Sequence, residues 1–296
     1  MLESVPLSFV VYYLDKVVLL RCRGDFNETF RAGIDLLGGY EPRSPFVVKP
    51  NLCTGDDHTG CANVKLEVVE SLVSYVLEQD PRADIRIMES DSMSKYADKA
   101  FERYGYRAYA ERLADEGASV ELINLSKSPL TRFNFNGDYF KHPELPEVLS
   151  STRDIASIAL AKTHSLTMVT GALKNMFGLL PRKDQAFYHP SIHEVILDLN
   201  RMFRSSLCLI DARMGLEGVI SGTPKEVGCL ILGTNPVSVD STMARVMGFE
   251  PKRIRHIVEA SKHGLGSMDP EVLGDEVEPL TVRFREPSGL KKSAVL

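Results

Sequence analysis

The sequence predicts an α/β protein with a mostly parallel sheet, crossover helices and one β-hairpin insertion. Two observations support this fold class. Apolar runs of strand length alternate with amphipathic stretches of helical period along most of the chain, which is typical of strand–helix–strand units. Between the two halves of the chain, a segment alternates around Asn136-Gly137, and this dipeptide strongly favours a tight hairpin turn.

The first half of the chain shows the strand–helix alternation most clearly. A helix over 26–37 is expected to begin after Asp25, whose carboxylate can accept backbone hydrogen bonds, and to end at Gly38-Gly39. Pro50 ends the second strand, because proline lacks the N–H that a sheet requires. The elements expected here are strands over 16–22, 45–49, 83–88 and 119–123, with helices over 26–37 and 64–79 and helical stretches up to 116.

The second half repeats this rhythm and suggests a domain organisation. Strands are expected over 154–161, 206–211 and 227–232, and helices over 166–177, 192–203, 237–247 and 251–263. The hairpin interrupts the pattern, so the chain can be divided into two α/β lobes. The division is an N-terminal lobe over 1–125, a hairpin and connection over 126–150, a C-terminal lobe over 151–286, and a loose polar tail over 287–296. One continuous domain is the alternative.

Composition argues against several classes of protein. The 296 residues are 44% apolar and 25% charged, as in ordinary globular proteins, and a net charge of −5 argues against a general nucleic-acid binder. No apolar run approaches the roughly 20 residues that span a bilayer. The apolar stretch from Val5 to Leu20 is interrupted by Asp15 and Lys16 and follows no basic region. We therefore expect folded structure rather than a signal peptide, and a cytoplasmic location.

The cysteines favour reduced thiols over a disulfide framework or a cluster. They are five in number and widely scattered: Cys22, Cys53, Cys61, Cys208 and Cys229. An odd, scattered set is typical of a reducing compartment, and no two of them have the spacing of an iron–sulfur cluster motif. Cys53 and Cys61 lie in a polar loop, where they could form a metal clip or simply be two loop thiols. We prefer the second interpretation and expect no metal site.

Polar segments that directly follow predicted strands indicate where a ligand would bind. In open α/β sheets, ligands lie beyond the carboxyl ends of the strands. Four such segments are 49–52, 89–92, 162–164 and 211–213. Lys49 and Lys162 begin two of these segments and Lys174 follows later, so the three amines predict a site that neutralises a carboxylate or phosphate. The alternative is that each lysine reaches outward to solvent.

The segment 163–190 contains most of the remaining candidates. Thr170 and Gly171 precede Lys174 and Asn175, and a helix that begins at these small residues would offer free backbone N–H groups to an anion. Gly171 could instead permit close packing. The segment matches neither a dinucleotide-binding fingerprint nor a Walker phosphate loop, because the required glycine spacing is absent.

Histidine and aspartate side chains extend the predicted site. His164 and His189 are candidates for proton transfer or metal binding, because imidazole titrates near neutral pH, although either can be structural. Asp211 and Asp240 could orient a lysine or histidine. Aspartate is also common in turns, and Asn235 before Asp240 can cap a helix. No serine lies in a nucleophile-elbow pattern, which argues against an α/β-hydrolase.

Several of these segments together resemble the domain of unknown function 362 family. They are Lys49-Pro50-Asn51-Leu52, Lys162-Thr163-His164, 170–178, His189-Pro190 and 235–240, within a resemblance that runs over 15–265. Members of that family often carry a ferredoxin-like domain with two four-iron clusters. This chain lacks the cysteine runs for such clusters, so the resemblance does not imply cluster binding here. The site is also similar in style to that of lactate racemases, which combine lysine and histidine with a nickel-bearing cofactor, and we carry over no metal.

The residues and the resemblance lead to one main hypothesis. We expect an enzyme, an isomerase or an oxidoreductase, that acts on a small anionic molecule by proton transfer or by reduction. The expected catalytic residues are His164, Lys174 and Lys49, and the expected substrate-binding residues are Lys162, Asn51, Thr170, Gly171, Asn175, His189, Asp211 and Asp240.

The cofactor stays open in this hypothesis, and we expect neither a nucleic-acid nor a membrane partner. One alternative is a non-catalytic protein that binds a ligand or metallo-cofactor for a ferredoxin-type redox partner. The other is a structural or regulatory protein with an empty pocket.

Overall fold

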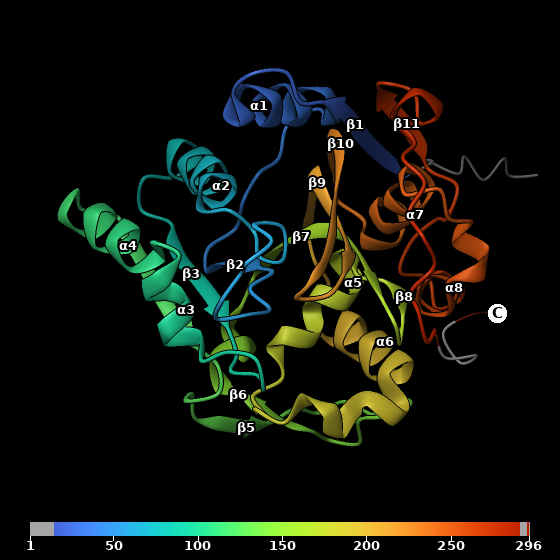
Figure 1. Ribbon diagram of the computed structural model, residues 1–296. Coiled ribbons are helices and arrows are strands. Elements are labelled where there is room, and N and C mark those ends of the chain that lie inside the picture. Colours follow the sequence, from blue (N-terminus) through green and yellow to red (C-terminus); the bar gives the residue numbers. More distant parts are fainter. Residues whose placement is uncertain (1–14, 291–294, 296) are drawn as a thin grey trace, which may run out of the picture.

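A nine-stranded sheet forms the centre of the computed structural model, which describes residues 15–290 and 295 (Figure 1). The strand order is β11-β1-β10-β9-β7-β2-β3-β4, with β8 paired to β7. The strands are β1 (Lys16–Arg21), β2 (Phe46–Pro50), β3 (Asp84–Glu89), β4 (Ser119–Asn124), β7 (Asp154–His164), β8 (Met168–Val169), β9 (Leu207–Gly218), β10 (Gly222–Gly233) and β11 (Glu271–Gly274).

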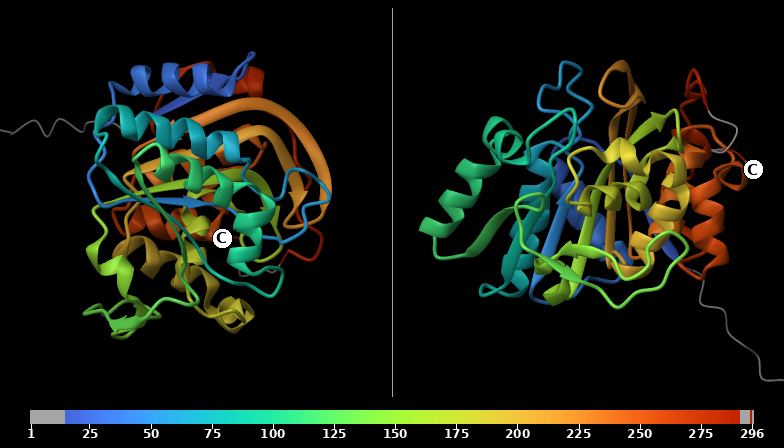
Figure 2. Two further views of the ribbon diagram at one scale, coloured as in Figure 1. Left: turned by 90° about the vertical axis from the view of Figure 1, so that its left-hand side faces the viewer. Right: turned by 90° about the horizontal axis from the view of Figure 1, so that it is seen from below.

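The sheet is mostly parallel, which confirms the predicted fold class. Strands β9, β7, β2, β3 and β4 run parallel, and so do β1 and β11, whereas β10 is antiparallel to both of its neighbours. The antiparallel pair β9–β10 is long and curves away from the flat part of the sheet (Figure 2). Its tip over 219–221 therefore approaches the carboxyl end of β7, where a ligand site was expected.

Helices cover both faces of the sheet, because the strand side chains alternate between two apolar clusters. Val17 and Leu19 of β1 belong to one cluster and Val18 belongs to the other. Helices α1 (Phe26–Leu37), α2 (Leu66–Gln79), α3 (Ala97–Arg103) and α4 (Tyr106–Asp115) pack on the Val18 side. Helices α5 (Gly171–Asn175), α6 (Ile192–Met202), α7 (Pro236–Val246) and α8 (Arg255–Lys262) pack on the opposite side.

The predicted helix over 166–177 is wrong in its first part. A turn and the short strand β8 occupy this stretch, and α5 begins only at Gly171. Thr170 donates its hydroxyl to the carbonyl oxygens of Leu160 and Lys162, which holds the chain against β7. Met168 and Gly171 both have positive φ angles, 68° and 89°, so a continuous helix cannot pass through them.

A hairpin forms in the predicted region, but its regular ladder lies on either side of the alternating segment 133–140 and not within it. Its antiparallel ladder joins β5 (Leu130–Arg132) to β6 (Glu144–Pro146), with one isolated bridge from Asn136 to Lys141. The carboxylate of Asp198 on α6 accepts hydrogen bonds from the backbone N–H groups of residues 138–140. These bonds hold the turn against α6, and Gly137 and His142 still donate cross-strand bonds to the carbonyl oxygens of Phe140 and Phe135.

The predicted lobes share one sheet, since β2 pairs with β7 across the proposed division. The lobe boundaries stay a prediction. Most of the Val5 to Leu20 stretch and much of the predicted tail lie outside the described residues. Within residues 15–290, no helix combines the length and the apolar character needed to cross a bilayer.

Two buried histidines stack between α6 and α8, with the ring centroids of His193 and His256 6.1 Å apart. Within the described residues, none of the four ring nitrogens makes a well-formed hydrogen bond. Burial lowers the pKa of His193 to about 4 and places that of His256 well below its usual range, and the nearby backbone offsets this only in part. The folded protein therefore prefers both rings neutral.

The histidine pair predicts a loss of stability in acid. Below pH 6.5 these histidines hold fewer protons in the folded state than in the unfolded state, because their folded pKa is depressed. The free energy of unfolding is therefore highest above pH 6.5 and falls as the pH drops toward 4. We expect the double variant His193→Leu and His256→Leu to reduce the difference in unfolding free energy between pH 7 and pH 5 by about 3–4 kcal/mol, which is about 2 kcal/mol for each histidine. Urea titrations at both pH values measure this, and an unchanged difference contradicts it.

Candidate functional site

A cleft of about 350 Å³ opens at the carboxyl ends of β2, β3 and β7. The tip of the β9–β10 pair and the segment over 185–189 complete its walls. The residues that line it are Lys49, Asn51, Leu52, Cys53, Glu89, Ser92, Met93, Ser94, Lys95, His164, Lys174, Asn175, Phe177, Gly178, Gln185, Ala186, His189, Val219 and Ile220. Lysines from three separate elements therefore meet at one edge of the sheet.

Glu89 is a buried carboxylate held between two buried amines. The Lys49 Nζ lies 2.8 Å from Glu89 Oε2, and the Lys95 Nζ lies 3.7 Å from Glu89 Oε1. Burial lowers the pKa of Lys49, and the nearby Glu89 charge opposes that effect. Two lysines share one carboxylate, so the floor of the cleft retains a positive excess.

Lys162 lies beneath the cleft rather than on its surface, and its side chain is 1% exposed. Its Nζ donates to Asn51 Oδ1 at 2.7 Å and to the Ala62 carbonyl at 2.7 Å, and it lies 3.2 Å from Cys53 Sγ. Asn51 and Cys53 in turn line the cleft. Lys162 therefore positions two lining residues and adds positive charge from below.

Lys174 presents an amine that no acidic side chain neutralises within the described residues. It lies on α5, and its Nζ stands 5.3 Å from the centre of the Phe177 ring. Burial lowers the pKa of Lys174 to about 8, and the charges of Lys162 and Lys49 act in the same direction. The Lys174 amine therefore titrates close to neutral pH.

His164 is neutral at physiological pH. Its side chain is 8% exposed at the end of β7, and burial, together with the charge of Lys174, places its pKa well below the usual range. The Nδ1 atom accepts a hydrogen bond from the Leu166 backbone N–H at 3.1 Å. The proton of the neutral ring is therefore on Nε2, which leaves that N–H as a hydrogen-bond donor.

Asp240 anchors the start of α5 instead of facing the cleft. It is fully buried on α7 and accepts the backbone N–H groups of Ala172 at 2.6 Å and Leu173 at 2.9 Å. A Cβ on Gly171 would come within 2.4 Å of Asp240 Oδ1, so glycine is required there. Burial raises the pKa of Asp240 to about 7. The backbone donors that could have received an external anion are thus occupied by this carboxylate.

Six of the eleven predicted site residues line the cleft and five do not. The six that line the cleft are Lys49, Asn51, His164, Lys174, Asn175 and His189. The five that do not are Lys162, Thr170, Gly171, Asp211 and Asp240. Asn175 Nδ2 donates to the Lys49 carbonyl at 2.8 Å and fixes α5 against β2. Asp211 pairs with Arg213 instead of with a lysine or histidine of the cleft.

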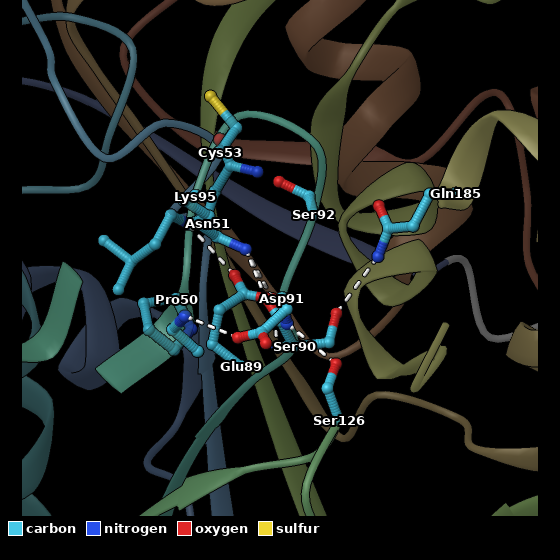
Figure 3. Close-up of polar contacts among 12 residues, drawn as sticks. Pro50, Asn51, Cys53, Glu89, Ser90, Asp91, Ser92, Lys95, Ser126 and Gln185 are labelled. Atoms are coloured by element: carbon cyan, nitrogen blue, oxygen red, sulfur yellow. Dashed lines mark hydrogen bonds and ion pairs between the residues drawn. The ribbon is translucent and has the colours of Figure 1, made fainter. Parts of the chain in front are cut away.

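Several lining residues were not among the predicted site residues, and four polar ones among them are Glu89, Lys95, Cys53 and Gln185. Glu89 had a signal, since it follows a predicted strand in one of the four polar segments. Lys95 comes from the loop after β3, and Gln185 begins a 3-10 helix within the 163–190 segment, where its residue type gave no signal of its own. Figure 3 shows Gln185 directed at Ser90, whose hydroxyl oxygen accepts from the Gln185 amide at 3.0 Å.

The loop that contains Cys53 and Cys61 is organised by an aspartate. Asp57 accepts backbone hydrogen bonds from Thr59, Gly60, Ala62 and Asn63. No group of three or more histidine, cysteine or acidic side chains is arranged to hold a metal ion within residues 15–290. The role visible for Cys53 is its contact with the Lys162 amine at the cleft wall.

Comparisons with known proteins identify a family but no activity. The family model named "Domain of unknown function (DUF362)" matches residues 47–245. The "Thylakoid-associated protein sll1697" of Synechocystis sp. is 22% identical over 267 residues, covering 84% of this chain and 78% of the relative. The lactate racemase apoprotein from Thermoanaerobacterium thermosaccharolyticum superimposes with a TM-score of 0.48 at 10% identity. That alignment covers 79% of this chain and spans 57% of the racemase chain.

Proposed function

This chain belongs to the domain of unknown function 362 family, and we propose that it is an enzyme that binds a small anionic substrate in the lysine-lined cleft and moves a proton on it. The observation that carries the proposal is the Lys174 amine. It faces a cleft, it is not neutralised by an acidic side chain within the described residues, and its pKa is near neutrality.

The positive excess at the cleft favours an anion. Glu89, the one acidic residue in the lining, is already shared by Lys49 and Lys95. Lys162 adds its charge from below. A carboxylate or phosphate that enters the cleft would therefore be attracted by several amines, of which only Lys49 and Lys95 already contact Glu89. The partly buried setting strengthens that attraction.

Lys174 is the group best suited to exchange a proton, because a pKa of about 8 allows both protonation states near neutral pH. His164 is a weak base, since its pKa is far lower. Its Nε2–H can donate a hydrogen bond to negative charge that develops on the substrate. This assignment differs from the expectation that His164 moves the proton. The pH dependence of the reaction distinguishes Lys174 from His164 as the base.

Deuterium exchange tests the proposal without knowledge of the natural substrate. Small carboxylates that carry a C–H bond next to the carboxylate are incubated with the protein in D₂O, and loss of that proton is followed by NMR. If the neutral Lys174 amine is the base, kcat/KM rises as the pH increases through about 8 and then levels. Lys174→Met reduces exchange to the uncatalysed rate and weakens acetate binding about tenfold at pH 7.

Lys262→Met is the matched control, since it removes the same charge from an exposed position on α8 that does not line the cleft. It should leave exchange and binding unchanged. Exchange that persists in Lys174→Met contradicts the proposal. Tight anion binding with no exchange for any carboxylate favours the rival function, a non-catalytic ligand-binding protein that serves a redox partner. Reduction of the substrate would require an electron donor from outside this chain.

A further inference from the structure

The cleft lining contains apolar side chains as well as lysines. Leu52 and Phe177, which are 1% and 4% exposed, form part of the inner wall beside the polar groups. Val219 and Ile220 come from the tip of the β9–β10 pair, and Met93 comes from the loop after β3. The amines are therefore placed deep in the cleft, and apolar side chains accompany them toward the opening.

The opening itself carries large apolar side chains that are left in solvent. Met93 is 73% exposed and Ile220 is 41% exposed, and both line the cleft. Phe187 and Tyr96, which are 54% and 48% exposed, follow the lining residues Ala186 and Lys95 in the chain, and the cations of Arg182 and Lys183 lie over their rings. In the described part of the chain, Met93 and Ile220 are therefore the two exposed apolar side chains of the cleft lining that a ligand could remove from water.

A bound molecule with two chemical parts would satisfy both features. Its anionic group would lie against the lysines, whose charges have no acidic partner other than Glu89 in the cleft lining. Its hydrocarbon part would lie against Leu52 and Phe177 and remove Met93 and Ile220 from water. A volume of about 350 Å³ is near the lower end of ligand pockets and fits a small organic acid.

We infer that the substrate class of this site is amphipathic organic acids, with an anionic group bound at the lysine floor and an apolar chain bound along Met93 and Ile220. This inference rests on the proposed function and adds the chemistry of the tail. The apolar contacts supply affinity through burial, and the lysines fix the direction in which the molecule enters.

A homologous series of straight-chain carboxylates from acetate to octanoate tests the inference by calorimetry. Affinity for the wild-type protein should rise about fourfold with each added methylene until the chain passes the rim. The double variant Met93→Ser and Ile220→Ser should flatten this dependence. Octanol, which has the same tail without the charge, should bind more weakly than octanoate.

Two controls separate failure of this inference from failure of the proposed function. Leu130→Ser changes an exposed apolar side chain that does not line the cleft and should leave the series unchanged. Lys174→Met should weaken every member of the series by the same factor. Acetate binding with no dependence on chain length overturns the inference and leaves the proposed function standing. Octanol binding as tightly as octanoate also overturns it, and no binding of any carboxylate overturns both.

Discussion

Replacing Glu89 with glutamine is expected to lower the free energy of unfolding by about 3–5 kcal/mol, because it leaves two buried amines without their carboxylate. The Glu89 side chain is 3% exposed, and it also accepts the backbone N–H groups of Ser90 at 2.8 Å and Leu52 at 3.2 Å. Glutamine keeps the shape but loses the charge. Urea denaturation at pH 7, followed by circular dichroism, measures the loss.

The control for this prediction is Glu121→Gln, an exposed position on β4 with the same change in charge. It should change the unfolding free energy by less than about 0.5 kcal/mol. The combination of Glu89→Gln with Lys95→Met should recover part of the loss, because it removes one of the two unpaired amines. A Glu89→Gln variant as stable as the wild type would show that the two amines do not depend on this carboxylate.

Gly178→Ala is expected to destabilise the fold by about 3 kcal/mol and to weaken anion binding as well. A Cβ at this position would lie 2.6 Å from Lys49 Cε, 2.7 Å from Lys49 Nζ and 2.6 Å from Glu89 Oε1. The backbone of Gly178 is not in the left-handed region, so alanine brings no backbone strain. The cost comes from displacing the ends of the Lys49 and Glu89 side chains from their buried ion pair.

Gly55→Ala is the matched control, since a Cβ there would make only ordinary contacts of 3.5 Å or more without backbone strain. It should leave the unfolding free energy within about 0.5 kcal/mol of the wild type. Thermal denaturation and acetate titration of both variants provide the measurement. Equal behaviour of Gly178→Ala and Gly55→Ala would mean that the Lys49–Glu89 pair can rearrange freely.

The helices whose ends are set by neighbouring capping residues could be predicted from the sequence. Asp25 accepts from the Asn27 backbone and Gly38 has φ of 92°, so α1 begins and ends where the sequence indicated. Asn235 likewise caps α7 through the N–H groups of Val237 and Ser238. The region around α5 differs, because its limits depend on Asp240 from a distant helix and on the attachment of Thr170 to β7. Neither contact produces a recognisable pattern in the sequence around α5.

The candidate site was predictable where side chains follow strands. Lys49 lies one residue before the end of β2 and His164 ends β7, and the topology of a parallel sheet brings those ends together. The same reasoning could not tell whether Asp211 faced the cleft, because its pairing with Arg213 depends on the twist and curvature of β9. Lys95 was missed because only the fold brings its loop over Glu89.

Titration of the Lys174 amine by NMR, with and without acetate, most directly tests whether this cleft is an anion site. We predict a pKa of about 8 in the free protein, rising by about one unit if acetate binds the charged amine tenfold more tightly than the neutral form. A Lys174 that titrates near 10.5 in the free protein and does not respond to acetate would contradict the account.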